Sequence, residues 1–406
     1  MGRGTVPRRM AAVLLALVCV AALVLTVARG YGYQLLPPWP ASGLVFTAAD
    51  APSSSPPFAE RASGASTPIV SLEASSVEEE IERETQWLLA CQMPDGAIAQ
   101  TPLGDSVVPY FANLAAKTMV DIEPARARWY ITWYIEHMNL PDRFGLAGTV
   151  YDYELGRDGL TPTYGYDSAD SYAATFLSLA SYYLEKTRDR EFITANLESI
   201  DLAVSVLLKL QDKDGLVVVT PGSTTKYLMD NGESFRGLTD WADALISLGF
   251  PEKAAAYRDV AERIRKGIER ILYDPARGVY AYSLSWLGKR FPKAGKWYPD
   301  AVSQLELITS GVLSPDDPRA AKIWEDFNAQ FPSWNQGVKA DGFPWAKIAL
   351  TAAMMRDIGQ ASEFLTWVSE HFAQKDRPYP WYVLESASII DLYRALNPDS
   401  TTSQPG

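Results

Sequence analysis

A repeat of about sixty residues is the feature that most constrains how this chain can fold. Gly96, Gly159, Gly215, Gly278 and Gly337 each lie in a long connection after a predicted helix, and neighbouring members are 56 to 63 residues apart. A period of this length accommodates two helices and two connections. The spacing therefore predicts a repeated helical hairpin.

Apolar residues between these glycines recur with helical spacing and predict twelve helices. Ser168 and Asp189 are the predicted N-caps of the fourth and fifth helices, because their side-chain oxygens can accept backbone N–H bonds there. The twelve predicted helices cover residues 76–92, 108–120, 123–139, 168–187, 190–211, 233–248, 251–273, 299–309, 316–330, 343–357, 358–373 and 385–397.

The connections alternate between long and short. Residues 121–124, 249–252 and 357–360 form short connections, and the first two place Pro124 and Pro251 at the start of a helix. Short connections make consecutive helices antiparallel neighbours. We therefore predict an all-α fold, an (α/α)6 barrel or six-hairpin toroid with inner and outer helices alternating. An open superhelix of helical hairpins is the alternative.

The N-terminal segment has the composition of an export signal. Residues 1–30 begin with Arg3, Arg8 and Arg9, and residues 10–27 are uncharged and almost wholly apolar. That length is compatible with a cleaved signal peptide and with a membrane anchor, and both interpretations stay open. Because the basic residues come first, we expect the remainder of the chain outside the cytoplasm, either secreted or tethered to the outer face of the membrane through residues 10–27.

The rest of the chain divides by composition. Residues 31–75 are rich in Pro, Ser and Ala and have no periodicity, which is typical of a disordered linker. Residues 76–398 form the predicted catalytic domain, and residues 399–406 a disordered tail.

Charge and composition exclude several classes of function. The formal net charge is −12, which disfavours a nucleic-acid partner. The chain has two histidines, neither in a group with ligand spacing, and no Gly-rich phosphate loop, so we expect no metal and no cofactor. Cys91 lies on an apolar helix face and is predicted to be a buried thiol.

Aromatic residues, 12% of the chain, gather in the long connections and at the helix starts beside them. Such rings can stack on the apolar faces of sugars or pack into the mouth of a barrel. The rings in question are Tyr151, Tyr153, Tyr164, Tyr166, Trp286, Trp297, Tyr298, Trp334, Trp345, Tyr379, Trp381 and Tyr382.

Carboxylates gather at the starts of the even-numbered helices, which would form the inner ring. Acidic residues also favour helix N-termini for capping and dipole reasons, and this is the alternative explanation for each of them. Their convergence from five helices favours a shared cavity. The residues are Asp167, Asp170, Asp230, Glu233, Asp300, Asp341 and Glu385.

Over residues 76–397 this organisation resembles the six-hairpin glycosidases, especially the glucoamylase-like enzymes. In that group the general acid lies just before the sixth helix in an Asp-x-x-Glu pattern, which Asp230 and Glu233 match. The resemblance implies that Glu233 is the acid and that Glu385, before the twelfth helix, is the general base. It also implies that Asp95 binds a sugar hydroxyl.

The sequence thus predicts an exported glycoside hydrolase that acts on an oligo- or polysaccharide, and the resemblance implies an inverting mechanism. The carboxyl groups of Glu233 and Glu385 would then lie roughly 6.5–9.5 Å apart. Two alternatives stay open: a polysaccharide lyase and a non-catalytic carbohydrate-binding protein on the same toroid. The predicted substrate-binding residues are Asp167, Asp170, Asp230, Arg236 and Asp300 for hydroxyls, with Tyr164, Trp345 and Trp381 for stacking.

Overall fold

The structure is a computed structural model that describes residues 74–338 and 341–397, all within one compact unit of the chain. The predicted signal or anchor segment, nearly all of the predicted linker and the predicted tail lie outside the described residues. Within the described ranges, no helix is long and apolar enough to cross a membrane. Helices make up most of this unit, and its strands are few and short.

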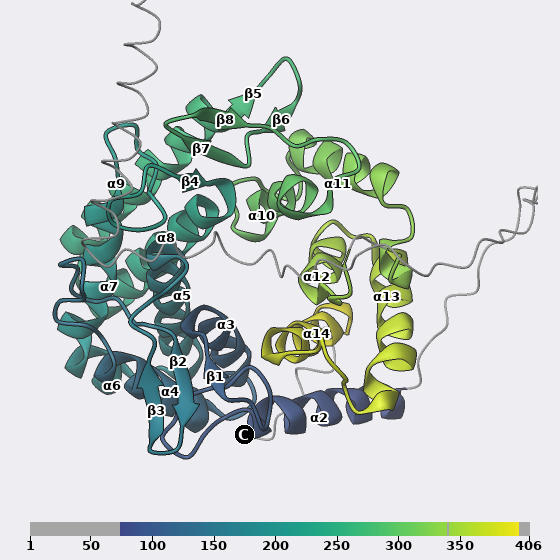
Figure 1. Cartoon of the computed structure of the whole chain (residues 1–406), viewed down its shortest axis with the longest axis horizontal. Helices are drawn as coiled ribbons and strands as arrows, with labels where there is room; N and C mark the ends of the chain where they lie inside the picture. The colour runs from purple at the N-terminus through teal and green to yellow at the C-terminus, as the bar shows by residue number, and fades with distance from the viewer. Residues whose placement is uncertain (1–73, 339–340, 398–406) are drawn as a thin grey trace, which may run out of the picture. The chain divides into compact units, whose positions relative to one another are not determined.

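Six helices follow one another round a common centre (Figure 1). Each contacts the next, and the last, α14, contacts the first, α3. These six correspond to the even-numbered predicted helices. In chain order they are α3 (Pro109–Met119), α5 (Ala169–Thr187), α8 (Leu228–Leu248), α10 (Val302–Thr309), α12 (Ala346–Met354) and α14 (Val383–Leu396).

A second helix packs on the outside of each of these six (Figure 1). Every outer helix contacts the inner helix of its own hairpin, except that α2 contacts α14 from the other end of the chain. The outer helices are α2 (Ala74–Ala90), α4 (Pro124–Glu136), α7 (Leu197–Leu210), α9 (Pro251–Gly267), α11 (Pro318–Gln330) and α13 (Ile358–His371). All twelve predicted helices are therefore present, with the expected alternation of inner and outer positions.

One helix that was predicted to be continuous is interrupted in the structure. The segment 190–211 is two helices, α6 (Arg190–Ala195) and α7, separated at Asn196. The Asn196 side chain donates to the Phe192 carbonyl at 2.9 Å, so it competes with the backbone for a helical acceptor. The predicted cap at Asp189 is confirmed, because its carboxylate accepts the Phe192 N–H at 3.1 Å.

The predicted N-cap position of Ser168, at the start of α5, is confirmed, but the expected capping hydrogen bond is not formed. Its hydroxyl donates instead to the carboxylate of Asp170 at 2.6 Å. The residue at this position is thus part of a side-chain cluster, to which we return below.

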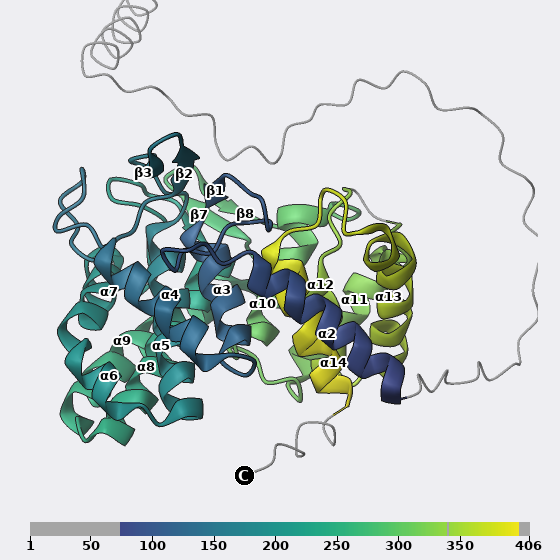
Figure 2. The ribbon, with the colours of Figure 1, turned by 90° about the horizontal axis from the view of Figure 1, so that it is seen from below.

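Short strands, which the sequence did not predict, occupy the long connections. One antiparallel sheet has the order β1-β2-β3, a second has the order β4-β7-β8, and β5 pairs with β6. Figure 2 shows β1, β2, β3, β7 and β8 at the same end of the helices. The strands are β1 (Ser106–Val107), β2 (Tyr153–Gly156), β3 (Gly159–Pro162), β4 (Lys226–Tyr227), β5 (Tyr273–Asp274), β6 (Val279–Tyr280), β7 (Ser283–Ser285) and β8 (Gly288–Arg290).

Irregular helical turns complete the long connections. A π-helical turn follows α9 and another precedes α10, while one 3-10 turn follows α11 and another follows α13. They are η1 (Ile268–Leu272), η2 (Trp297–Ala301), η3 (Trp334–Gln336) and η4 (Ala373–Lys375). Cys91, at the end of α2, is 1% exposed, which confirms the predicted buried thiol, and burial raises its pKa.

Two helices of the ring, α5 and α8, approach each other closely. A Cβ atom at Gly237 would lie 2.3 Å from the Ala174 carbonyl oxygen, so only glycine permits this approach. Because the obstacle is backbone, neither helix can yield without moving its neighbours. The approach also sets the spacing between the starts of α5 and α8, where the predicted site residues lie.

We predict that Gly237→Ala lowers the free energy of unfolding by about 1–3 kcal/mol or more, since overpacking forces the backbone apart. Chemical denaturation with circular dichroism measures this. Gly359→Ala is the matched control: it lies near the start of α13, where an added Cβ would meet no atom within 4 Å, and it should be neutral or slightly stabilising. Equal stability of the two variants would contradict the close approach of α5 to α8.

Candidate active site

Five carboxylates and one lysine meet at the inner helix starts. Asp167 and Asp170 come from the beginning of α5, and Asp230 and Glu233 from the first turns of α8. Glu306 of α10 and Lys347 of α12 complete the group, which we call the acidic cluster. Positions 230 and 233 are three apart, so both side chains lie on one face of α8.

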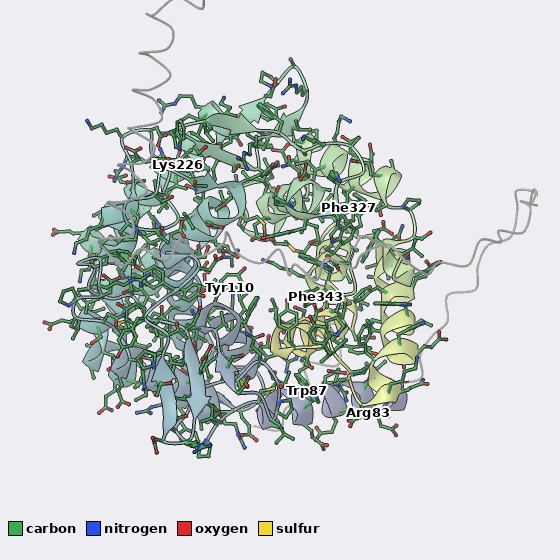
Figure 3. The ribbon with its side chains drawn as sticks, in the orientation of Figure 1. Arg83, Trp87, Tyr110, Lys226, Phe327 and Phe343 are labelled. Atoms are coloured by element: carbon green, nitrogen blue, oxygen red, sulfur yellow. The ribbon has the colours of Figure 1, made fainter. Side chains whose placement is uncertain are left out.

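Glu233 is 8% exposed and has two identified partners. The Tyr110 hydroxyl donates to its Oε1 at 2.6 Å, and Figure 3 shows Tyr110 on the side of α3 that faces the centre. The Lys347 ammonium lies 3.7 Å from the same oxygen and 2.7 Å from Glu306. Burial raises the pKa of Glu233 to about 7, although Lys347 and the Tyr110 hydroxyl oppose the rise. Glu233 can therefore hold a proton near neutral pH.

Ser168 links two further carboxyls. Its hydroxyl oxygen lies 2.6 Å from Asp170 and 3.1 Å from Asp230. A serine hydroxyl has one proton to donate, so it satisfies only one carboxylate; the other must bring its own proton. Burial raises the pKa of Asp170 to about 8, and burial together with the charges of Asp170 and Glu233 raises the pKa of Asp230. Asp170 and Asp230 therefore both hold a proton more readily than an exposed aspartate does.

Asp167 stands at the outer edge of the acidic cluster. Its side chain is accessible to solvent, but partial burial of the carboxyl group raises its pKa to about 6. The buried Asp170 Oδ2 has no hydrogen-bond partner among the described residues. The cluster therefore presents carboxyl groups of graded accessibility, from open Asp167 through Asp230 to enclosed Asp170.

Glu385 lies in the first turn of α14 and is 3% exposed. Its Oε1 accepts the Trp345 N–H at 3.1 Å and its Oε2 accepts the Ala346 N–H at 2.8 Å. These N–H groups are at the start of α12, where free donors and the helix dipole stabilise a negative charge. The contact fixes the orientation of the carboxylate.

The start of α12 connects Glu385 with the acidic cluster. Ala346 bonds to Glu385, and the next residue, Lys347, reaches Glu233 and Glu306. Tyr298 is near both groups: its ring centroid is 5.5 Å from that of Trp345, and burial together with the charges of Asp230, Asp167 and Glu233 raises its pKa. Glu385 and Glu233 are thus connected through two consecutive residues of α12, Ala346 and Lys347.

Six of the predicted site residues therefore come together, namely Asp167, Asp170, Asp230, Glu233, Trp345 and Glu385. Trp345 is partly exposed beside Tyr298, and its indole N–H donates to Asp341 at 2.9 Å. Tyr164 lies at the rim, 62% exposed, with its ring 5.8 Å from that of Tyr151.

Three other predicted residues have local structural partners. Asp95 is exposed and its carboxylate accepts the Ala97 N–H at 3.1 Å, which stabilises a turn. Asp300 is 8% exposed and accepts the Lys293 N–H at 2.8 Å. Trp381 is 2% exposed, and its indole donates to Ser386 at 2.8 Å, so its faces are covered by protein.

Arg236 lies away from the acidic cluster. It forms an ion pair with Asp240, one turn further along α8, at 2.8 Å. With Lys117 and Arg188 it lines a separate cavity of about 160 Å³ near the ends of α3 and α5. Each step of three residues rotates a side chain by about 60° and advances it about 4.5 Å along the helix axis, so Arg236 lies about 120° round and about 9 Å along α8 from Asp230.

Sequence reasoning missed four residues of the site: Tyr110, Asp152, Glu306 and Lys347. Asp152 accepts a bond from the Tyr172 hydroxyl at 2.8 Å, and burial raises its pKa to about 7. Glu306 and Lys347 lie inside helices, where a charged residue usually faces solvent. The sequence did offer one indication of their role, because Glu306 and Lys347 both lie on helices that were predicted to be in the inner ring.

Metal binding has no support in the described part of the chain, where no three His, Cys, Asp or Glu residues are grouped so as to hold an ion.

Comparison with known proteins gives a likeness of fold alone. No family model matches the chain, and no curated protein matches its sequence. Among solved structures, "Glycosidase Wild Type" matches with a TM-score of 0.57 and 16% identity over 80% of this chain and 99% of that one. A rhamnosidase from Klebsiella oxytoca with rhamnose bound matches with a TM-score of 0.56 and 13% identity, over 82% of this chain and 66% of that one.

A GH78 family rhamnosidase of Bacillus sp. GL1 matches with a TM-score of 0.54 and 12% identity, over 79% of this chain and 35% of that one. The predicted resemblance to the six-hairpin glycosidases is confirmed at the level of the fold.

We predict that the acidic cluster makes the protein lose stability as pH rises. A carboxyl whose pKa is higher in the folded than in the unfolded state binds more protons when folded, so its contribution is present below about pH 4 and is lost as pH rises through the folded value of about 8 for Asp170. Asp170→Asn keeps the acceptor oxygen and cannot ionise. Relative to the unmodified chain it should gain about 3–4 kcal/mol between pH 5 and pH 8.

Thermal denaturation at both pH values measures the effect. Asp158→Asn, in the exposed turn between β2 and β3, removes a carboxylate outside the cluster and is the matched control. A pH-independent effect of Asp170→Asn would show that folding does not raise the pKa of Asp170.

Proposed function

We propose that this protein is a glycoside hydrolase in which Glu233 is the general acid and Glu385 the general base. The observation that carries the proposal is the pairing of two buried carboxylates across the start of α12. One has a raised pKa of about 7, and the other is oriented by two backbone N–H groups. Glycoside hydrolysis requires one carboxyl that holds a proton and one that does not.

Glu233 has the environment of a proton donor. Protonated Glu233 transfers its proton to the glycosidic oxygen as the bond from the anomeric carbon to that oxygen breaks. Lys347 and the Tyr110 hydroxyl then stabilise the carboxylate that remains. A pKa close to the working pH makes both protonation states available within one catalytic cycle.

Glu385 would accept a proton from the attacking water. Its two backbone bonds hold the carboxylate in place, and each carboxylate oxygen can accept more than one hydrogen bond. In the inverting course that the family resemblance implies, water attacks the anomeric carbon from the face opposite the leaving oxygen. The configuration of the first-formed product tests this course directly.

Asp230 is the competing candidate for the acid. It is more accessible than Glu233, and burial together with the charges of Asp170 and Glu233 raises its pKa. In our proposal Asp230 and Asp167 bind sugar hydroxyls, and the rings of Trp345 and Tyr298 stack on the sugar. Asp170, which is 0% exposed, supports Asp230 through the Ser168 hydroxyl. Tyr164 at the rim would contact a sugar unit further out.

The contacts between consecutive inner helices, with α14 against α3, support the finer description of the fold as an (α/α)6 barrel. The fold neighbours support a carbohydrate substrate, because they are glycosidases, one of them in complex with glucose, and rhamnosidases. Export, with or without a membrane tether through residues 10–27, is part of the proposal and rests on the sequence alone.

Two alternatives have distinct signatures. A polysaccharide lyase would release unsaturated products that absorb ultraviolet light, and a carbohydrate-binding protein would bind without releasing products. The ion pair of Lys347 with Glu306 favours hydrolysis over lysis, because the cation nearest Glu233 is already engaged by carboxylates and is poorly placed to neutralise a uronate.

We predict that Glu233→Gln lowers kcat by about 10²–10⁴-fold, because it removes the proton donor and keeps the shape of the side chain. An oligosaccharide panel read by chromatography identifies the substrate, and steady-state kinetics on that substrate measures the loss. Asp230→Asn is the matched variant and should raise KM more than it lowers kcat. The opposite ranking of the two variants would assign the acid to Asp230.

Asp95→Asn, which keeps the acceptor of the exposed turn, should retain full activity. Circular dichroism of each variant separates loss of chemistry from loss of fold.

We also predict that activity falls above about pH 7, as Glu233 loses its proton. Lys347→Met should move this alkaline limb to higher pH, because the Lys347 charge lowers the pKa of Glu233 and its removal lets that pKa rise. Profiles of kcat/KM against pH for both proteins measure the shift. An unchanged limb in Lys347→Met would mean that another group sets it.

A further inference from the structure

An exposed apolar tip ends the hairpin formed by β7 and β8. Trp286 is 79% exposed and Leu287 is 65% exposed, and these two residues form the turn between the strands. Most large apolar side chains of this unit are buried. Two adjacent exposed ones, an indole and an isobutyl group, therefore indicate a surface that interacts with a partner.

The segment that carries this tip is basic within an acidic protein. Residues 275–299 contain five Lys or Arg residues and no Asp or Glu, whereas the whole chain has a net charge of −12. Lys289, Arg290, Lys293 and Lys296 are all exposed, and none of them forms an ion pair with any residue that the structure describes. Their charges are therefore available to an external partner.

The hairpin is rigidly attached beside the candidate active site. Strand β7 pairs with β4, and Ser283 lies opposite Tyr227, which precedes Asp230 by three residues. The connection after β8 is also held, because the Asp300 carboxylate accepts the Lys293 N–H. Figure 1 shows β4, β7 and β8 together beside α8, and Figure 2 shows β7 and β8 at the end of the helices where the other long connections lie.

We propose that the β7–β8 hairpin docks on an anionic lipid surface. Trp286 and Leu287 would enter the boundary between headgroups and acyl chains, and the four cations would contact lipid phosphates. A tip of tryptophan and leucine flanked by lysine and arginine is the composition that favours the membrane interface. This inference does not depend on the proposed chemistry.

Carbohydrate is the weaker candidate for the occupant of this tip. A sugar ring stacks on a flat aromatic face, and Trp286 alone could provide one. The branched aliphatic side chain of Leu287 has no such face, yet it is exposed beside Trp286 to nearly the same degree. An anionic lipid surface explains both features, because its acyl chains accommodate the two apolar side chains and its phosphates pair with the exposed cations. Docking there would hold the entrance to the acidic cluster next to the surface, within reach of glycans attached to it.

A site-specific fluorescent label tests the proposal in the full chain. Leu287→Cys is made together with Cys19→Ser and labelled with a polarity-sensitive dye; Cys91 is 1% exposed and should not react. The labelled protein is titrated with phosphatidylcholine vesicles and with the same vesicles containing phosphatidylglycerol. Ile246→Cys, a 45% exposed position towards the opposite end of α8, carries the control label.

We expect a blue shift at position 287 with the anionic vesicles only, and none at position 246. The label position separates docking of the hairpin from vesicle binding by any other segment. Adding Lys289→Gln and Arg290→Gln should raise the half-saturating lipid concentration about tenfold or more, since each cation near an anionic surface contributes about fivefold. Added salt should weaken the interaction in the same direction.

Three results would overturn the proposal. The first is an unshifted label at position 287, and the second is an equal shift at both label positions. The third is a larger shift with a soluble anionic polysaccharide than with vesicles, which would assign the surface to a glycan.

Discussion

The Glu385 carboxylate accepts N–H bonds from both Trp345 and Ala346, and this contact joins the start of α14 to the start of α12. The next residue on α12, Lys347, extends the connection to Glu233 and Glu306. One helix start thus sets the positions of the two carboxylates that the proposed chemistry needs. If α12 began one residue earlier or later, Lys347 would face another direction and would lose its contacts with Glu233 and Glu306.

The same arrangement places several carboxyl groups where water is scarce. Burial is the largest cause of the raised pKa of Glu233, Asp170 and Asp230. Near neutral pH such a cluster stabilises the fold less than apolar residues of the same volume would, because ionised members repel one another. Retaining it is consistent with a role in proton transfer, since groups that exchange protons near pH 7 must have pKa values moved towards that range.

The repeat that indicates the fold has a structural origin. Gly96, Gly215 and Gly337 have positive φ angles, and a Cβ atom at each would collide with Trp129 of α4, with Arg263 of α9 and with Trp367 of α13. The turns at Gly96 and Gly215 share a further feature, because Asp95 and Asp214 each accept the N–H two residues later. The Asp95 carboxylate, which the family resemblance linked to sugar binding, is therefore engaged in the turn that the repeat requires.

Sequence alone determined the twelve helices and their alternation, because apolar periodicity and proline at helix starts are local signals that tertiary contacts leave intact. It also determined which helix starts carry carboxylates. Only the tertiary structure decided which of those carboxylates meet: Asp167, Asp170, Asp230 and Glu233 do, while Asp300 turns to the Lys293 backbone. It likewise decided that Arg236 pairs with Asp240 and that Tyr110 and Lys347 join the site. The physical reason is that rotation about a helix axis and depth along it are fixed by packing against neighbouring helices, which no local pattern encodes.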